Sequence, residues 1–156
     1  MPEVRLTRQD PRDPEALALA VELSAFLTAL YPEDVDDPSS PWGAQDIVRA
    51  GTFLVARVDG EPVGCGGLTP GGLRGALEVI RMYVRPGHRG RGIADAILAE
   101  LETFARDNGA ARIVLRCGPR QPEALRLYER NGYAVRDVFA HHREHPTNVF
   151  YEKALA

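Results

Sequence analysis

The stretch EVIRMYVRPGHRGRGIAD, residues 78–95, decides the fold. It begins as an apolar strand, continues as a turn rich in arginine and glycine, and ends where an amphipathic helix begins. Four arginines, Arg81, Arg85, Arg89 and Arg91, lie in it with no acidic residue between Glu78 and Asp95. Glycines let successive backbone N–H groups point to one place, and a helix start adds unpaired N–H groups and a positive dipole end. The stretch therefore predicts an anion site of diphosphate size on the amides of residues 89–94.

Two familiar nucleotide motifs are not met here. A Walker motif needs Lys and Ser or Thr after its last glycine, and Gly92 is followed by Ile93 and Ala94. A dinucleotide fingerprint needs a third glycine at position 95, which is Asp95. The alternative to an anion site is a surface turn that binds nothing.

The flanking sequence predicts a mixed α/β (α+β) fold. A strand at 76–84, a helix at 93–108 and a strand at 112–117 form a β-α-β unit, which requires parallel strands. An Asp59-Gly60 turn between strands 52–58 and 61–68 predicts an antiparallel hairpin. The other expected elements are a strand at 4–8, helices at 14–31, 42–50 and 122–130, and strands at 133–139 and 148–155. We expect a mostly antiparallel sheet of six to seven strands with helices on both faces.

The first helix has its expected cap at Asp13, with Pro14 as its first residue. Apolar or small residues recur in it at spacings of three or four, which predicts one buried face. That face is Leu17, Ala20, Val21, Ser24, Leu27 and Leu30.

Composition sets the class of protein. The chain has 156 residues, 17.1 kDa and a net charge of −3, which predicts one domain over residues 1–156 and argues against a nucleic-acid partner. Cys65 and Cys117 make neither a disulfide framework nor a zinc set. No leader and no apolar run of about 20 residues is evident. We expect a cytoplasmic enzyme or binding protein that does not span a membrane.

Two motifs give the chain a family resemblance. Residues 89–94, RGRGIA, match the R/Q-x-x-G-x-G/A signature of the GNAT superfamily of N-acetyltransferases. Residues 124–133, ALRLYERNGY, look like its second motif, A-x-x-L-Y-x-x-x-G-F/Y. The expected element order is also that of the family. The stretch 118–124 is similar to a bacterial subgroup of small, largely unassigned acetyltransferases.

The resemblance implies acetyl-CoA as the donor. Its diphosphate would lie on the amides of residues 89–94, and its pantetheine arm between two parallel strands that splay apart, paired with the backbone of Met82 and Val84. Gln121 stands where many members carry Asn, a departure that bears on contacts with the arm. The implied cofactor-binding residues are Met82, Tyr83, Val84, Arg89, Gly90, Arg91, Gly92, Ile93, Ala94, Gln121 and Tyr128.

Two catalytic roles follow from the resemblance and from acid–base chemistry. Tyr128 matches the general acid that protonates the departing thiolate; its alternative is a helix tyrosine packed against the sheet. Glu78 is the candidate base, because an acceptor ammonium must lose a proton before it attacks. The alternatives for Glu78 are a charge at a strand edge or an ion pair with Arg81.

The acceptor is expected to be a small amine, amino-acid-like or polyamine-like. Arg81 and Arg120 hint at a substrate carboxylate, whereas the acidic run 33–37 would attract a cation. The loop with His141, His142 and His145 is expected to shape the acceptor site rather than hold a metal, or else to be an exposed loop. A protein N-terminus or lysine is the rival acceptor, and a CoA-binding sensor without turnover is the rival class. A homodimer would be common in the family, although no residue here requires one.

Overall fold

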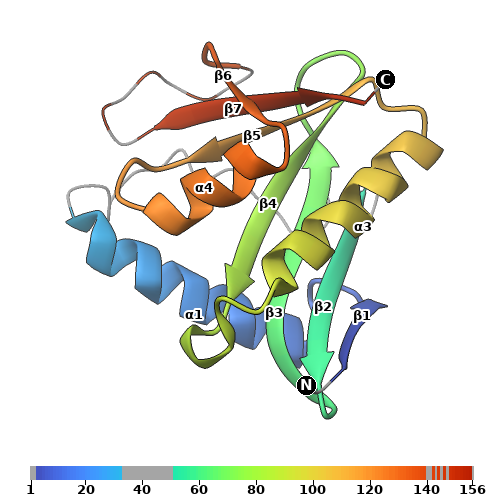
Figure 1. The fold of residues 1–156 in the computed structure, drawn as a ribbon, viewed down its shortest axis with the longest axis vertical. Helices are drawn as coiled ribbons and strands as arrows, with labels where there is room; N and C mark the ends of the chain where they lie inside the picture. The colour runs from blue at the N-terminus through green and yellow to red at the C-terminus, as the bar shows by residue number, and fades with distance from the viewer. Residues whose placement is uncertain are drawn as a thin grey trace.

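The seven-stranded sheet has the order β1-β2-β3-β4-β5-β7-β6 (Figure 1). The computed structural model describes residues 3–32, 51–139, 142, 144, 146 and 148–155. The expected helix at 42–50 and the acidic run at 33–37 lie outside these residues. The elements are β1 (Val4–Arg8), α1 (Pro14–Leu30), β2 (Thr52–Val58), β3 (Glu61–Pro70), β4 (Ala76–Val84), the 3-10 turn η2 (Pro86–His88), α3 (Ile93–Asp107), β5 (Arg112–Cys117), α4 (Pro122–Arg130), β6 (Ala134–Arg136) and β7 (Val149–Ala154).

One strand pair of the sheet is parallel, β4 with β5, and the other pairs are antiparallel, as predicted. The parallel pairing runs only from Ala76↔Arg112 to Val79↔Leu115. Beyond that point β4 continues to Val84 beside β3, and β5 continues to Cys117 beside β7. Figure 1 shows the two strands meeting near one end and diverging toward the other. The backbone of β4 after Val79 is therefore open on the side that faces away from β3.

A bulge bends β4 at the point where the parallel pair separates. Gly67 pairs with Ile80 and Cys65 pairs with Tyr83, so Arg81 and Met82 share the space opposite a single residue of β3. Arg81 adopts a left-handed φ of 54°, a conformation that costs an L residue about 1–2 kcal/mol. No signal in the sequence marks this bulge.

The two larger of three hydrophobic clusters among the described residues lie on opposite faces of the sheet. On one face, α3 and α4 pack over the larger core, which holds Leu98, Leu101, Leu115 and Leu127. On the other face, α1 packs over Phe53, Val55, Cys65, Ile80 and Tyr83. Helices therefore cover both faces, as predicted, and the bulge directs Tyr83 toward α1 while Met82 and Val84 pack with the α3 core.

The buried face of α1 differs from the predicted one. Leu17 and Val21 are 44% and 68% exposed, while Ala16 and Leu19 are fully buried. The series continues through the partly buried Leu23 and Phe26. Because α1 is apolar around most of its circumference, the sequence pattern alone did not select the face.

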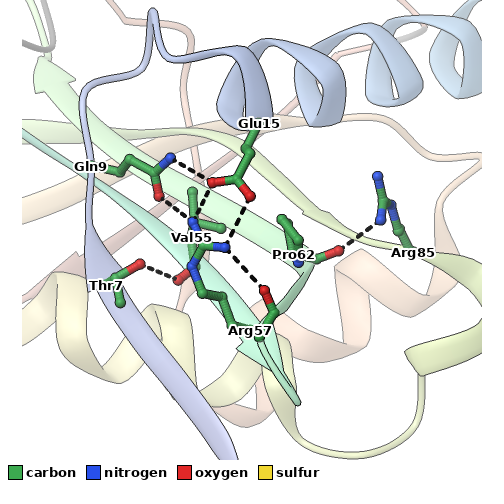
Figure 2. A network of polar contacts seen from close by, with 8 residues as sticks. Thr7, Gln9, Glu15, Val55, Arg57, Pro62 and Arg85 are labelled. Carbon is green, nitrogen blue, oxygen red and sulfur yellow. Dashed lines mark hydrogen bonds and ion pairs between the residues drawn. The ribbon is translucent and has the colours of Figure 1, made fainter.

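The start of α1 is fixed by side chains rather than by its cap. Asp13 occupies the cap position but its side chain makes no capping bond, contrary to expectation. Instead, Arg57 of β2 donates a hydrogen bond to Gln9 Oε1 (2.8 Å) and two to Glu15, as Figure 2 shows. The hydrogen bonds from Arg57 and from Gln9 Nε2 lower the pKa of Glu15 to about 2. The network joins α1 to the turn end of the hairpin, where Arg57 pairs with Pro62.

Three predicted strands have different bounds, and the strand expected at 148–155 is β7, Val149–Ala154. The strand expected at 133–139 is limited to β6, because Phe139 leaves the sheet to pack with Val114 and Phe150. The strand expected to end at 68 continues to Pro70, pairing with Leu77. Within the described residues, no helix has both the length and the apolar character needed to cross a membrane.

Candidate active site

A cleft of ≈ 770 Å³ lies between α1, the open end of β4, the turn before α3 and the start of α4. Ten of the residues singled out by sequence line it: Met82, Tyr83, Val84, Arg89, Gly90, Gly92, Ile93, Ala94, Arg120 and Gln121. Glu78, Arg81, Arg91, Tyr128 and His142 are not among its lining residues. His141 lies outside the described residues. The cleft thus brings together most of the predicted cofactor residues.

The turn before α3 has the geometry of an anion site. Gly90 and Gly92 adopt φ values of 77° and 78°, which glycine reaches without strain. Gly92 caps α3 and no side chain caps the helix. The first helical bond runs from Ala96 N–H to Gly92 O, so the amides of residues 93–95 have no acceptor within the helix. A methyl group added at Gly90 or Gly92 would meet no atom within 4 Å, so a ligand can approach the backbone closely.

Arg89 is held against the cleft wall. Its Nε donates to Val84 O at 2.9 Å. Its guanidinium lies 4.9 Å from the ring centre of Phe26 and 5.8 Å from that of Tyr83. Stacking on two aromatic rings limits the motion of this cation. The role of Phe26 was not predicted from the sequence. It belongs to the observed buried face of α1, on which Ala16, Leu19, Leu23 and Phe26 recur at spacings of three or four.

The positive charge of the cleft comes only in part from the predicted arginines. Arg85 turns away to α1, where it forms an ion pair with Glu22 (2.7 Å) and donates to Pro62 O (2.7 Å). Figure 2 shows the second of these bonds. The arginines that line the cleft are Arg89 and Arg120, which the sequence singled out, and Arg126 and Arg130, which it did not. Two acidic residues, Asp95 and Glu123, also line it.

Asp95 lies in the first turn of α3, where its charge would repel an anion. Arg130 donates to it at 2.9 and 2.6 Å, and Asn131 donates at 2.9 Å. The hydrogen bonds from Arg130 and Asn131 hold the pKa of Asp95 below its usual range. The pair leaves the helix start with little net negative charge.

Tyr31, at the end of α1, binds two residues of the cleft, Arg120 and Gln121. Its hydroxyl donates to Gln121 Oε1 (3.2 Å) and accepts the backbone N–H of Arg120 (3.0 Å). Its ring fills the place where residue 118 would carry a side chain, so only glycine fits there. Arg120 in turn donates to Leu30 O (2.8 Å). These bonds join the end of α1 to the loop before α4.

Tyr128 is buried, at 5% exposure, beside the cleft rather than in its wall. Its ring packs 5.6 Å from that of Tyr133 and 6.2 Å from that of Tyr151. Burial, with a smaller effect from Cys117, raises the pKa of its hydroxyl. The group therefore keeps its proton at neutral pH, as both the general acid and the packed tyrosine require.

Glu78 forms a buried pair with His142. Glu78 Oε2 lies 3.0 Å from His142 Nε2, and the two side chains are 1% and 2% exposed. The His142 ring packs against Phe139 at 4.9 Å, so this part of the loop is not exposed. The alternative of a Glu78–Arg81 ion pair is wrong, because no such pair forms among the described residues. Glu78 Oε1 and Arg81 Nη1 are both buried without a hydrogen-bond partner.

Comparison with known proteins gives a consistent result. The family model for the acetyltransferase (GNAT) family matches residues 17–133. An "IAA acetyltransferase" of Azospirillum brasilense is 33% identical over 156 residues, 99% of this chain and 100% of that protein. A streptothricin acetyltransferase of Streptomyces lavendulae is 26% identical over 108 residues, 69% of this chain and 57% of the relative.

Solved structures share the fold along the whole chain. A provisionally assigned acyl-CoA N-acyltransferase from Klebsiella pneumoniae has a TM-score of 0.81 and 34% identity over 98% of both chains. An N-acetyltransferase from Thermoplasma acidophilum, solved with coenzyme A, has a TM-score of 0.72 and 18% identity over 97% of this chain and 99% of its own. A family member from Elizabethkingia anophelis, solved with acetyl-CoA, has a TM-score of 0.68 and 16% identity over 97% of both chains.

Proposed function

The chain belongs to the GNAT family of acetyl-CoA-dependent acetyltransferases, and from that premise we propose that it acetylates the primary amine of a small molecule. The observation that carries the proposal is the buried Glu78–His142 pair beside the point where β4 and β5 separate. Because Glu78 and His142 are almost fully enclosed, a small amine can reach this proton acceptor more easily than a lysine or N-terminus on the surface of another protein.

The cleft would supply groups for the diphosphate and the arm of acetyl-CoA, whose thioester provides an activated acetyl group. The amides at the start of α3, freed by Gly92, would hold the diphosphate, together with the arginines of the wall. The open backbone of β4 around Met82 and Val84 would pair with the amides of the arm. Gln121, which lines the cleft and is already bonded to Tyr31, would border that arm.

Glu78 would accept the proton of the acceptor ammonium, directly or through a water molecule. Its Oε2 is fixed by His142, which leaves Oε1 to take the proton. Tyr128 would supply a proton to the departing thiolate, since burial keeps its hydroxyl protonated. A thiol leaves fairly readily, with a pKa near ~8.5, so one hydroxyl donor is sufficient.

We also propose a domain extent and a location for the chain. We take residues 1–156 as one catalytic domain that acts in the cytoplasm. The family match over residues 17–133 and a relative aligned over nearly the whole chain support this assignment.

The test is release of free thiol from acetyl-CoA in the presence of amine panels: amino acids, polyamines and short lysine peptides. We expect release with small amines. Release only with peptides would assign a protein acetyltransferase instead. Micromolar binding of CoA with no release from any panel would assign a CoA-binding sensor.

A further inference from the structure

One arginine beside the cleft, Arg81, has a buried nitrogen with no hydrogen-bond partner among the residues that the structure describes. Of the arginines that the structure describes, Arg81 alone has a buried guanidinium nitrogen with no hydrogen bond. The neighbouring Arg85 and Arg89 are bonded to Glu22 and to Val84 O. A buried N–H donor without an acceptor is costly, and a charged donor more so. The absence of a partner among the described residues therefore points to an anionic group of a ligand.

Arg81 lies where the acyl end of the cofactor cleft would be. Parallel pairing ends at Val79, and Arg81 is the bulged residue two positions further on. Its charge opposes the effect of burial on the pKa of the Cys65 thiol, which packs in the core beneath α1. The Cys65 thiol also donates to Arg81 O (3.2 Å). The guanidinium is thus on the α1 side of the sheet.

Glu78 lies on the same side. Its strand neighbours Leu77 and Val79 pack with the α3 core, so the alternation of β4 directs Glu78 to the opposite face. Three positions separate Glu78 from Arg81, about 10 Å along a strand. The two side chains do not pair with each other, and each leaves one buried polar atom unsatisfied. The site therefore presents an unpaired carboxylate oxygen and an unpaired guanidinium nitrogen on one face.

We propose that the acceptor is an amino acid or a similar zwitterion, whose amine is directed to Glu78 and whose carboxylate is bound by Arg81. The inference rests on the proposed function and narrows its substrate class. The diphosphate of the cofactor is not the anion that Arg81 meets, because its site begins eight residues further on, at Arg89. A polyamine would leave Arg81 unpaired and place a second cation beside it.

The test compares each of the twenty common L-amino acids with its carboxamide, which differs by the loss of the negative charge. Thiol release from acetyl-CoA gives kcat and KM, and thermal stabilisation by the amino acid in the presence of CoA gives an independent readout of binding. The wild-type protein should prefer at least one amino acid over its carboxamide by tenfold or more in kcat/KM. The Arg81→Gln variant should lose this preference through a tenfold or larger rise in the KM of the amino acid. The carboxamide and acetyl-CoA should keep their KM.

Two further variants control the result. Arg116→Gln removes the same charge from an exposed position of β5 that pairs with Phe150, and should keep the preference. Arg81→Lys keeps the positive charge and should retain part of the preference for the amino acid over its carboxamide. These two variants separate loss of carboxylate binding from a change in net charge or from misfolding.

Three results would overturn the inference. The first is equal kcat/KM for amino acids and their carboxamides in the wild-type protein. The second is turnover of polyamines without turnover of any amino acid. The third is a preference for the amino acid over its carboxamide that remains in Arg81→Gln. In all three cases the proposed acetyltransferase function stands. Absence of thiol release with every amine overturns the proposed function, and this inference with it.

Discussion

Replacing Gly92 by Ala tests whether the turn before α3 is the anion site. Gly92 has a φ of 78°, and an L residue pays about 1–2 kcal/mol to remain there. No atom lies within 4 Å of the added methyl group, so the cost is conformational and not a clash. The turn is exposed at this point, so the free protein can relax and release the strain. Binding must then restore the conformation, which weakens acetyl-CoA affinity by roughly 5- to 30-fold.

Gly109→Ala is the matched control at the other end of α3. Gly109 has the same φ of 78°, and its added methyl group also meets no atom within 4 Å. However, backbone bonds from Gly109 N–H to Arg106 O and from Ala110 N–H to Ala105 O hold this end. Its strain should therefore appear as lost stability, a fall in Tm of about 2–8 °C, with unchanged acetyl-CoA affinity.

The assay is calorimetric titration with acetyl-CoA, with Tm measured on the same samples. We expect Gly92→Ala to lose affinity with little loss of Tm, and Gly109→Ala to show the reverse. Wild-type affinity in Gly92→Ala would refute the reasoning, because the turn would then not contribute to binding. Equal loss of affinity in both variants would assign the effect to the stability of α3 as a whole.

Three other changes test the chemistry and the electrostatics. Tyr128→Phe should lower kcat tenfold or more while sparing acetyl-CoA affinity, and unchanged turnover would remove Tyr128 from the mechanism. Glu78→Gln should slow turnover and flatten the acid limb of the pH–rate profile, because the wild-type limb reports protonation of this base; an identical profile would exclude Glu78. Arg130 holds the pKa of Asp95 below its usual value, so the ionised carboxylate stabilises the fold above pH ~4. This stabilisation is lost as the pH falls from there through the lowered pKa of the folded state. Asp95→Asn should therefore lose less unfolding free energy than the wild-type protein between about pH 5 and pH 2 in urea titrations, and parallel acid curves for the two proteins would contradict this account.

Local sequence signals predicted the elements that the cofactor cleft needs. The glycines before α3 require positive φ, and the apolar spacing of α3 leaves one choice of buried face. The β-α-β unit required β4 and β5 to be parallel, and the resemblance implied that they separate. These features are encoded within short stretches of chain, which is why pattern analysis recovered them.

Features that depend on tertiary contacts were not predictable. The bulge at Arg81 arises from strand register, which no single residue specifies. The Glu78–His142 pair joins residues 64 positions apart. The cluster of four arginines is dispersed in the structure because Glu22 of α1 draws Arg85 away, and arginines of α4 take its place at the cleft. Charge counted along the chain therefore located the site, but of the four clustered arginines only Arg89 lines the cleft.

The most direct test of the account is a crystal structure with CoA bound. We expect the diphosphate within hydrogen-bond distance of the amides of residues 89–94, and the arm along Met82 and Val84. The thiol should end between Glu78 and Tyr128, close to Arg81. CoA bound elsewhere, or with its thiol directed away from the point where β4 and β5 separate, would contradict the account.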